Sequence, residues 1–296
     1  MLVNLKMLME DAEKNHYAVG AFNTPNLESI RAVIEAAEET GCPVILNHAQ
    51  NHDCFIPIEE IAPIMLQYAE KSHIPICLHI DHGEDMNFIM RAIRAGFTSV
   101  MYDCSGLPFD ENVLKVKALV ELAHPLGISV EAELGQMLDN DENGLVRNND
   151  KRKYFTSPDQ AARFCELTKV DALAIAFGSV HGEYKFPPEL DIELLQSIRR
   201  SVPVTTSLVM HGGSGTPPDQ LARAIREGIR KINYFSALNT ASTNTLKETC
   251  GKYSDKSIHF VDLSAEITSE IKKKCIETIQ FLQLQMDDRT SHSERM

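Results

Sequence analysis

The sequence predicts an α/β protein in which eight strand–helix units follow one another and close into a barrel. Short runs of β-branched residues alternate with longer amphipathic segments, a pattern typical of repeated units around a parallel sheet. The length of 296 residues suits one such barrel, which usually takes about 250. Polar side chains also gather at the ends of the short runs, where a barrel of this kind carries its functional groups.

Eight short apolar runs bounded by turn residues are the predicted strands. In chain order they are Ala18–Phe22, Val44–Asn47, Ile76–Asp81, Ser99–Tyr102, Ile128–Glu133, Ala172–Ala176, Val204–Val209 and Lys231–Tyr234. Mostly apolar runs of this kind are expected of parallel strands that are buried on both faces. We therefore expect one closed parallel sheet.

The segments between these runs have helical spacing. One face of the first segment is formed by Leu27, Ile30, Ile34 and Ala37. Thr24 is the predicted N-cap, with Pro25 in the first turn. A ninth helix is expected near the C-terminal end, packed outside the barrel or against another subunit. Its apolar residues recur every three or four positions: Ile267, Ile271, Cys275, Ile279, Leu282 and Met286.

The whole chain, residues 1–296, is predicted to be a single domain. Its expected fold is a (β/α)8 TIM barrel with an extra C-terminal helix and a frayed tail from about residue 288. The stretch 135–157 is too polar for a core and longer than an ordinary loop. A mobile lid and a solvated insertion are both open interpretations of it.

Composition and charge exclude several classes of protein. Hydrophobic residues make up 43% and charged residues 24%, as in ordinary globular proteins. The 42 acidic and 29 basic residues leave a net charge of −13, which repels nucleic acid and anionic lipid. No apolar stretch of about 18 residues and no signal-peptide pattern is present, and the seven cysteines form no CxxC pair. We therefore expect a cytoplasmic protein with reduced cysteines and no nucleic-acid or membrane partner.

Three histidines follow three different predicted strands. His82, His181 and His211 come after the third, sixth and seventh strands, whose carboxyl ends meet at one face of the barrel. Three imidazoles and an open position are what a catalytic Zn²⁺ requires. These histidines are therefore the candidate zinc ligands, and the alternative is that each one bonds the backbone at its strand end.

Three carboxylates accompany these histidines. Asp81 precedes His82 and, by strand alternation, is expected to point to the opposite side, toward substrate. This placement suits a general base or acid, and the alternative is that Asp81 orients a histidine. Asp103 and Glu133 follow the fourth and fifth strands and could bind a second or alternative metal position, or pair with Lys or Arg.

A glycine-rich turn, Gly212–Gly215, precedes a helix that opens with Pro217 and Pro218. Unhindered backbone N–H groups and a helix N-terminus form a natural phosphate cradle. Phosphate sites in such barrels usually come from the loops after strands seven and eight. The side chains and glycines that could touch one phosphate are Gly182, Ser214, Asn233 and Ser236, with Lys185 adding positive charge.

Five co-linear motifs carry a family resemblance: LHIDHG, MYDCSGLPFDENV, SVEAELG, DALAIAFGSVHGEYK and LVMHGGSGTP. Across nearly the whole chain they resemble the class II, metal-dependent fructose-bisphosphate and tagatose-bisphosphate aldolases. The resemblance implies a lyase of carbohydrate metabolism such as glycolysis, a small phosphorylated sugar substrate, and a homodimer or homotetramer. It also implies Zn²⁺, a second divalent position, and a monovalent cation, Na⁺ or K⁺, near the phosphate.

The same resemblance assigns roles to individual residues. Zn²⁺ would lie on His82, His181 and His211, Asp81 would transfer the proton, and Asn233 would contact the enediolate. Asp103 and Glu133 would lie near the alternative metal position. The implied phosphate contacts are Gly182, Lys185, Gly212, Ser214 and Ser236.

The implied reaction is retro-aldol cleavage. Asp81 would take the proton of the C4 hydroxyl, the C3–C4 bond would break, and the metal would stabilise the enediolate of dihydroxyacetone phosphate. A Schiff-base lysine is the other way to stabilise such a carbanion. No lysine stands at the carboxyl end of a predicted strand, because Lys231 begins the eighth.

Three segments depart from the family pattern. Tyr234 and Phe235 precede Ser236 where the family has small or acidic residues, and NHAQNHD replaces a Ser/Gly-rich stretch, so that His48, Gln50 and His52 could read a different sugar. The acid of the long loop has only approximate equivalents, Asp141 or Glu142. Two alternatives therefore stay open beside a fructose- or tagatose-bisphosphate aldolase: an aldolase for another phosphorylated keto sugar or sugar acid, and a catalytically silent sugar-phosphate-binding accessory subunit.

Overall fold

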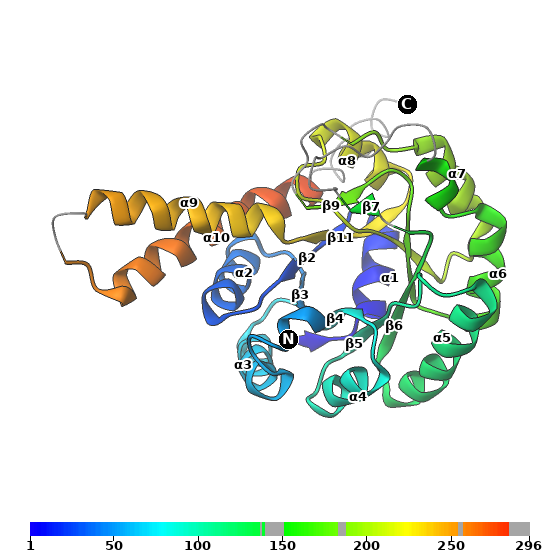
Figure 1. Ribbon diagram of the computed structural model, residues 1–296, viewed down its shortest axis with the longest axis horizontal. Helices are drawn as coiled ribbons and strands as arrows, with labels where there is room; N and C mark the ends of the chain where they lie inside the picture. Colours follow the sequence, from blue (N-terminus) through cyan, green and yellow to red (C-terminus); the bar gives the residue numbers. More distant parts are fainter. Residues whose placement is uncertain (137, 140–150, 183–187, 254–256, 284–296) are drawn as a thin grey trace.

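The computed structural model describes residues 1–136, 138–139, 151–182, 188–253 and 257–283. Eight parallel strands close into a barrel, with helices around its outside (Figure 1). In chain order these strands are β2 (Val19–Asn23), β3 (Val44–Ala49), β4 (Ile76–Gly83), β5 (Ser99–Tyr102), β6 (Ser129–Leu134), β8 (Ala172–Ile175), β10 (Ser207–Met210) and β11 (Ile229–Tyr234). Pairing of β4 with β5 completes the ring, which confirms the predicted TIM barrel.

Four strands begin at other residues than predicted, and in the first and fifth, β2 and β6, the difference is a single residue. The seventh was expected from Val204, but β10 begins at Ser207 because Thr206 N–H donates to Pro203 O and closes a turn there. The eighth was expected to begin at Lys231, but β11 begins at Ile229, which pairs with Leu208. Lys231 is therefore inside this strand and not at its start.

A helix follows each strand, and all of these helices except the last surround the barrel. They are α2 (Leu27–Thr40), α3 (Ile58–Lys71), α4 (Met86–Arg94), α5 (Phe109–Ala123), α6 (Pro158–Thr168), α7 (Ile192–Ser201), α8 (Pro218–Arg226) and α9 (Ser236–Lys252). The predicted N-cap Thr24 is wrong. Asn26 caps α2 instead, because its side chain accepts from Ser29 N–H, while Thr24 Oγ1 donates to Asn47 O.

Two apolar cores hold the barrel together. The larger core lies between the strands and the surrounding helices. The smaller core lies inside the barrel, where Leu5, Leu8 and Met9 of α1 (Leu5–Asn15) pack with inward side chains such as Ile45 and Val209. Helix α1 therefore closes the N-terminal end of the barrel by apolar burial.

The barrel interior becomes polar toward the carboxyl ends of the strands. Strand β4 shows the change: Cys77 belongs to the inner apolar core, while His79 and Asp81, two and four residues later on the same face, are buried polar side chains. The inner face of the barrel therefore carries functional groups at the end opposite α1.

The last two helices form an arm beside the barrel. Helix α10 (Phe260–Gln283) packs against α2 and buries four of the predicted apolar residues, Ile271, Cys275, Ile279 and Leu282. Figure 1 shows α9 and the first half of α10 extending away from the barrel. Met286 and the predicted frayed tail lie outside the described residues. Among the described helices, none is long and apolar enough to cross a membrane.

Candidate active site and metal centre

Two of the three predicted zinc ligands meet at the carboxyl end of the barrel. Single ligand atoms of Asp81, His82 and His211 all lie within 4.8 Å of one another. Strand alternation predicts that Asp81 and His82 point to opposite sides, and this expectation is wrong. His82 has a φ of 48°, in the left-handed region, and β4 loses regular register between Ile80 and Gly83. This local turn of the backbone brings both side chains to one site.

The third predicted ligand, His181, lies in the short strand β9 (Val180–His181). Its backbone pairs with β7 (Leu138–Asp139), in the register Asp139 with His181. The position of the His181 side chain is not part of what the structure describes. Its role as a ligand therefore stays a prediction.

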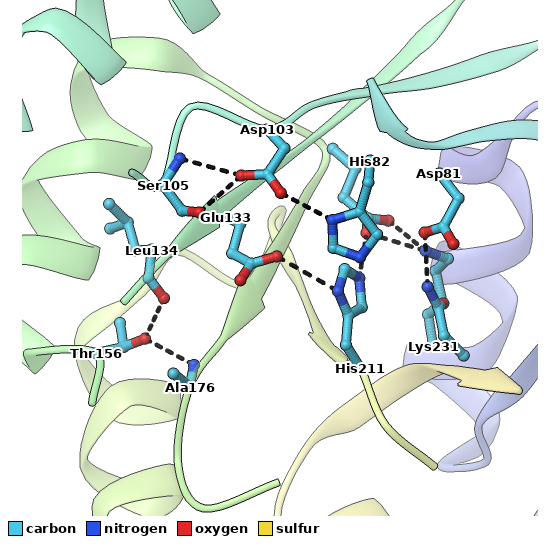
Figure 2. A network of polar contacts seen from close by, with 12 residues as sticks. Asp81, His82, Asp103, Ser105, Glu133, Leu134, Thr156, Ala176, His211 and Lys231 are labelled. Atoms are coloured by element: carbon cyan, nitrogen blue, oxygen red, sulfur yellow. Dashed lines mark hydrogen bonds and ion pairs between the residues drawn. The ribbon is translucent and has the colours of Figure 1, made fainter. Parts of the chain in front are cut away.

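A second group of possible ligands adjoins the first. Single ligand atoms of His82, Asp103 and Glu133 lie within 4.8 Å of one another. His82 Nδ1 is 2.7 Å from Asp103 Oδ2, and Ser105 donates through N–H and Oγ to Asp103 Oδ1 (Figure 2). Burial opposes ionisation of Asp103, but the hydrogen bond and charge of His82, together with the hydrogen bonds from Ser105, outweigh burial and lower the pKa of Asp103.

His211 lies between two buried glutamates. Its Nε2 is 3.2 Å from Glu131 Oε1. Its Nδ1 is 3.3 Å from Glu133 Oε2, on the side shown in Figure 2. Burial lowers the pKa of the imidazole, but the two carboxylates outweigh it and raise that pKa to about 10. Without a metal, His211 therefore carries a proton at neutral pH, which a bound cation would have to replace.

A buried ion pair between Lys231 and Glu131 adjoins His211. Lys231 Nζ lies 2.9 and 2.8 Å from the two carboxylate oxygens of Glu131, and both side chains are fully buried. Burial opposes ionisation of Glu131, but Lys231, His79 and His211 together outweigh it and lower the pKa to about 2. Lys231 thus stabilises the Glu131 carboxylate, which in turn contacts His211. The predicted position of Lys231 at the start of its strand did not indicate this role.

The Asp81 carboxylate is held by two asparagines. Asn233 Nδ2 donates to Asp81 Oδ1 at 2.8 Å, and Asn23 Nδ2 donates to Asp81 Oδ2 at 3.2 Å. Burial opposes ionisation of Asp81, but His82, His211 and Lys231 outweigh it and lower its pKa. The sequence analysis did not predict a role for Asn23. Its position at the carboxyl end of β2, like that of Asn233 near the carboxyl end of β11, is the signal that could have found it.

A cavity of about 610 Å³ opens over these groups, within the size range of small-molecule sites. Asp81, His82 and Asn233 form part of its wall. Asn233 Oδ1 is buried without a hydrogen-bond partner among the described residues, so it is available to a ligand hydroxyl. The remaining lining residues are Asn23, Ala49, Gln50, Asn51, His52, Glu84, Gly182, Gly212, Ser214, Phe235 and Ser236.

The predicted phosphate contacts that the structure describes line one side of this cavity: Gly182, Gly212, Ser214 and Ser236. Ser236 begins α9, whose N-terminal N–H groups favour an anion. The turn of Gly212–Gly215 presses against β11, because a Cβ on Gly213 would collide with Ile232 Cγ2 and lie 3.0 Å from Asn233 O. Lys185 lies outside the described residues.

The opposite side of the cavity contains the segment that departs from the family pattern. Gln50 and His52 line it, and the His52 ring lies 5.4 Å from the ring of Phe235. His48 is fully buried behind His52, with their ring centroids 5.8 Å apart, and is not part of the lining. Of the three side chains expected to read the sugar, two therefore reach the cavity.

Comparison with known proteins identifies the family. The family described as fructose-bisphosphate aldolase class-II matches residues 3–286. The uncharacterized protein YdjI of Escherichia coli K12 is 36% identical over 281 residues, which cover 95% of this chain and 97% of that protein. The crystal structure of the YdjI aldolase gives a TM-score of 0.84 at 35% identity, over 95% of this chain and 97% of that chain. A fructose-bisphosphate aldolase structure from Campylobacter jejuni has the same fold, with a TM-score of 0.81 at 23% identity over 95% of both chains. This chain therefore belongs to the class II fructose-bisphosphate aldolase family.

Proposed function

We propose that this protein is a zinc-dependent class II aldolase that cleaves a phosphorylated ketose to dihydroxyacetone phosphate and an aldehyde. One observation carries the proposal: the Asp81 carboxylate is fixed by Asn23 and Asn233 beside His82 and His211, at the wall of a cavity. A carboxylate held in one orientation beside potential metal ligands suits proton transfer to or from a sugar hydroxyl.

The residues around the site fit a divalent ion. Two imidazoles and the carboxylates of Asp81, Asp103 and Glu133 offer nitrogen and oxygen ligands of the kind that zinc accepts. In the proposal, His82, His181 and His211 hold the ion, while Asp103 and Glu133 lie beside an alternative position. A bound Zn²⁺ would supply Lewis-acid stabilisation of negative charge on the enediolate oxygens.

Asp81 then accepts the proton of the C4 hydroxyl as the C3–C4 bond breaks. C4 becomes the carbonyl carbon of the aldehyde, and the bonding electrons pass to the three-carbon half as an enediolate. Asn233 Oδ1 can accept a hydrogen bond from a hydroxyl group of this half while Nδ2 keeps Asp81 in place. Protonation of C3 gives dihydroxyacetone phosphate, and the predicted acids for this step, Asp141 or Glu142, lie outside the described residues.

The phosphate of the three-carbon half is assigned to the side of the cavity lined by Gly182, Gly212, Ser214 and Ser236. The N-terminus of α9 adds its dipole there, and Lys185 stays a predicted contact. A monovalent cation near this phosphate also stays a prediction. Binding of the phosphate at one end of the cavity would orient the C3–C4 bond beside Asp81.

Release of dihydroxyacetone phosphate tests the proposal. Purified protein with added zinc is incubated with fructose and tagatose 1-phosphates and 1,6-bisphosphates, and the product is measured with a coupled dehydrogenase. We expect cleavage of at least one sugar, loss of it with a chelator, and recovery with zinc. Cleavage that persists with the chelator contradicts the zinc mechanism, and binding without cleavage of any sugar favours the accessory-subunit alternative.

A further inference from the structure

One side of the cavity, formed by Gln50, Asn51, His52, Glu84 and Phe235, has no role yet in the mechanism. We call these five residues the distal wall. Most of it comes from the loops after β3 and β4, which stand across the ring from β8 and β10 in the strand order. The phosphate contacts Gly182 and Gly212 follow β8 and β10. A substrate held there by its phosphate therefore extends past Asp81 toward the distal wall.

His52 contributes a polar but uncharged side chain to the distal wall. It is 6% exposed, lines the cavity, and its Nδ1 has no hydrogen-bond partner among the described residues. Burial lowers the pKa of His52 below its ordinary value, so the ring is neutral at pH 7. A neutral imidazole exchanges hydrogen bonds with a hydroxyl group but supplies no positive charge.

Glu84 gives the distal wall a negative charge. Gln50 Oε1 accepts from the backbone N–H of Glu84 at 2.8 Å and from that of Asp85 at 3.0 Å, so the two loops are joined at this point. The Glu84 side chain is exposed and its residue lines the cavity. A phosphate dianion placed here would meet a carboxylate.

No positively charged side chain lies on this side among the residues that the structure describes. The described lining residues include neither Lys nor Arg. Arg91 on the nearby helix α4 is engaged elsewhere, with Nη1 at 2.8 Å from Asp53 Oδ2 and Nη2 at 2.6 Å from Glu59 Oε2. The ring of Phe235, packed near His52, instead offers an apolar face suited to the C–H groups of a sugar.

We propose that the distal wall selects an aldehyde half that carries hydroxyl groups and no phosphate, so that the substrate is a ketose 1-phosphate and not a ketose bisphosphate. This inference rests on the proposed retro-aldol function and names its substrate class. Neutral donors and acceptors, one carboxylate and an aromatic face match a polyhydroxylated chain, whereas a second phosphate would be desolvated beside Glu84 without a cation.

The test is a matched pair of acceptors in the condensation direction. Zinc-loaded protein and dihydroxyacetone phosphate are supplied with glyceraldehyde or glyceraldehyde 3-phosphate, which differ only in the phosphate, and with erythrose or erythrose 4-phosphate. We expect kcat/KM to be about tenfold or more higher for the unphosphorylated member of each pair, because like charges are juxtaposed in the other. Equal or higher kcat/KM for the phosphorylated members overturns the inference.

A charge reversal tests the role of the wall itself. Glu84→Lys should raise kcat/KM for glyceraldehyde 3-phosphate relative to glyceraldehyde by about fivefold or more, since it replaces repulsion by attraction. Glu166→Lys is the matched control, because Glu166 is exposed in the C-terminal half of α6, away from the cavity. A Glu84→Lys ratio equal to that of the control contradicts the assignment of the wall.

The outcomes separate the two proposals. Condensation with a preference for phosphorylated acceptors sustains the aldolase function and refutes the distal-wall inference alone. If no acceptor condenses and no ketose phosphate is cleaved, the aldolase proposal fails and the inference fails with it.

Discussion

At the scale of single residues, the site depends on ionised groups that the barrel holds out of water. Asp81, Glu131 and Lys231 are almost completely buried, yet each has a partner of opposite charge or a hydrogen-bond donor. Buried charges are stable only when paired in this way. The effect of substituting one of these residues on turnover or stability should therefore depend on whether its partner is left as an unpaired buried charge.

Asp81 is expected to be required for turnover and not for metal binding by the histidines. Asp81→Asn keeps a polar side chain of the same shape but cannot accept a proton, so kcat should fall by about a hundredfold or more. Metal content, measured by atomic emission, should stay close to that of the parent. A variant with parental kcat would assign the proton transfer to another group.

Lys231 should be required for stability. Lys231→Met leaves the Glu131 carboxylate buried without its cation, which costs about 3 to 5 kcal/mol of unfolding free energy. Glu131→Gln in the same chain should restore part of this loss, because the isolated charge is removed. Lys117→Met, at an exposed pair with Glu121, is the control and should change stability by about 1 kcal/mol or less. Denaturant unfolding of the zinc-free proteins compares the parent, Lys231→Met, the double variant and the control. Equal stability of Lys231→Met and the control would contradict the expectation.

Zinc affinity should rise with pH. The pKa of His211 is about 10 in the metal-free fold, against about 6.5 for an ordinary imidazole. Its proton therefore stabilises the metal-free fold fully below pH 6.5, and this contribution is lost as the pH rises toward 10. Zinc must displace that proton, so affinity measured by chelator competition should increase about tenfold per pH unit between pH 6.5 and 8.5. His211→Gln should bind more weakly and show a smaller dependence; the same slope in both proteins would refute this origin.

At the scale of elements, the strand ends decide which side chains meet. The left-handed backbone of His82 overrides the alternation of β4, and Asn26, not Thr24, caps α2 because its side chain reaches Ser29 N–H. The turn at Gly212–Gly215 lies so close to β11 that Gly213 has no room for a side chain. Because Asn233 of β11 bonds Asp81, the close contact of this turn with β11 places the phosphate side of the cavity relative to Asp81.

Gly213→Ala should therefore weaken phosphate binding. The added Cβ would force the turn away from Ile232 and from Asn233 O, and KM for the cleaved ketose phosphate should rise about tenfold, since a small displacement of a positioning loop has large effects. Gly106→Ala is the matched control, because nothing lies within 4 Å of its added Cβ. Steady-state kinetics compare the two, and equal KM values would separate the turn from phosphate binding.

At the scale of the whole molecule, the arm of α9 and α10 leaves apolar side chains in solvent. Phe260 is 80% exposed and Val261 is 70% exposed at the start of α10, where the arm is far from the barrel (Figure 1). Exposed apolar groups at such a position are typical of an interface. The homodimer or homotetramer expected from the family resemblance stays a prediction that this arm can test.

Replacement of both residues by serine should lower the mass of the assembly. Light scattering coupled to gel filtration should show an oligomer for the parent and a smaller species for Phe260→Ser with Val261→Ser, since burial of the two side chains is lost. Unfolding of the barrel should change little. A parent that is itself monomeric would contradict the expected assembly, and an unchanged mass in the variant would place the interface elsewhere.

The eight strand–helix units, the apolar row of α10 and the meeting of His82 with His211 at one end of the barrel follow from the sequence. They depend on local periodicity and on the rule that parallel strands present their carboxyl ends at one face, so no long-range detail is needed. Asn23, the Glu131–Lys231 pair and the joining of the loops by Gln50 were not predicted. Each involves partners from different strands, and the spacing of residues along the chain does not indicate which side chains will pair across the barrel.

The sequence by itself determined the family and the barrel, because motif order and apolar periodicity are properties of the chain alone. Only the tertiary structure decided that Lys231 lies within β11, bonded to Glu131, that His82 turns toward Asp81, and that His52, Glu84 and Phe235 share one wall of the cavity. These are relations between side chains many residues apart. Closure of the barrel brings these side chains into contact at the cavity. Their combined charge and shape can be compared with a substrate only once the cavity is formed.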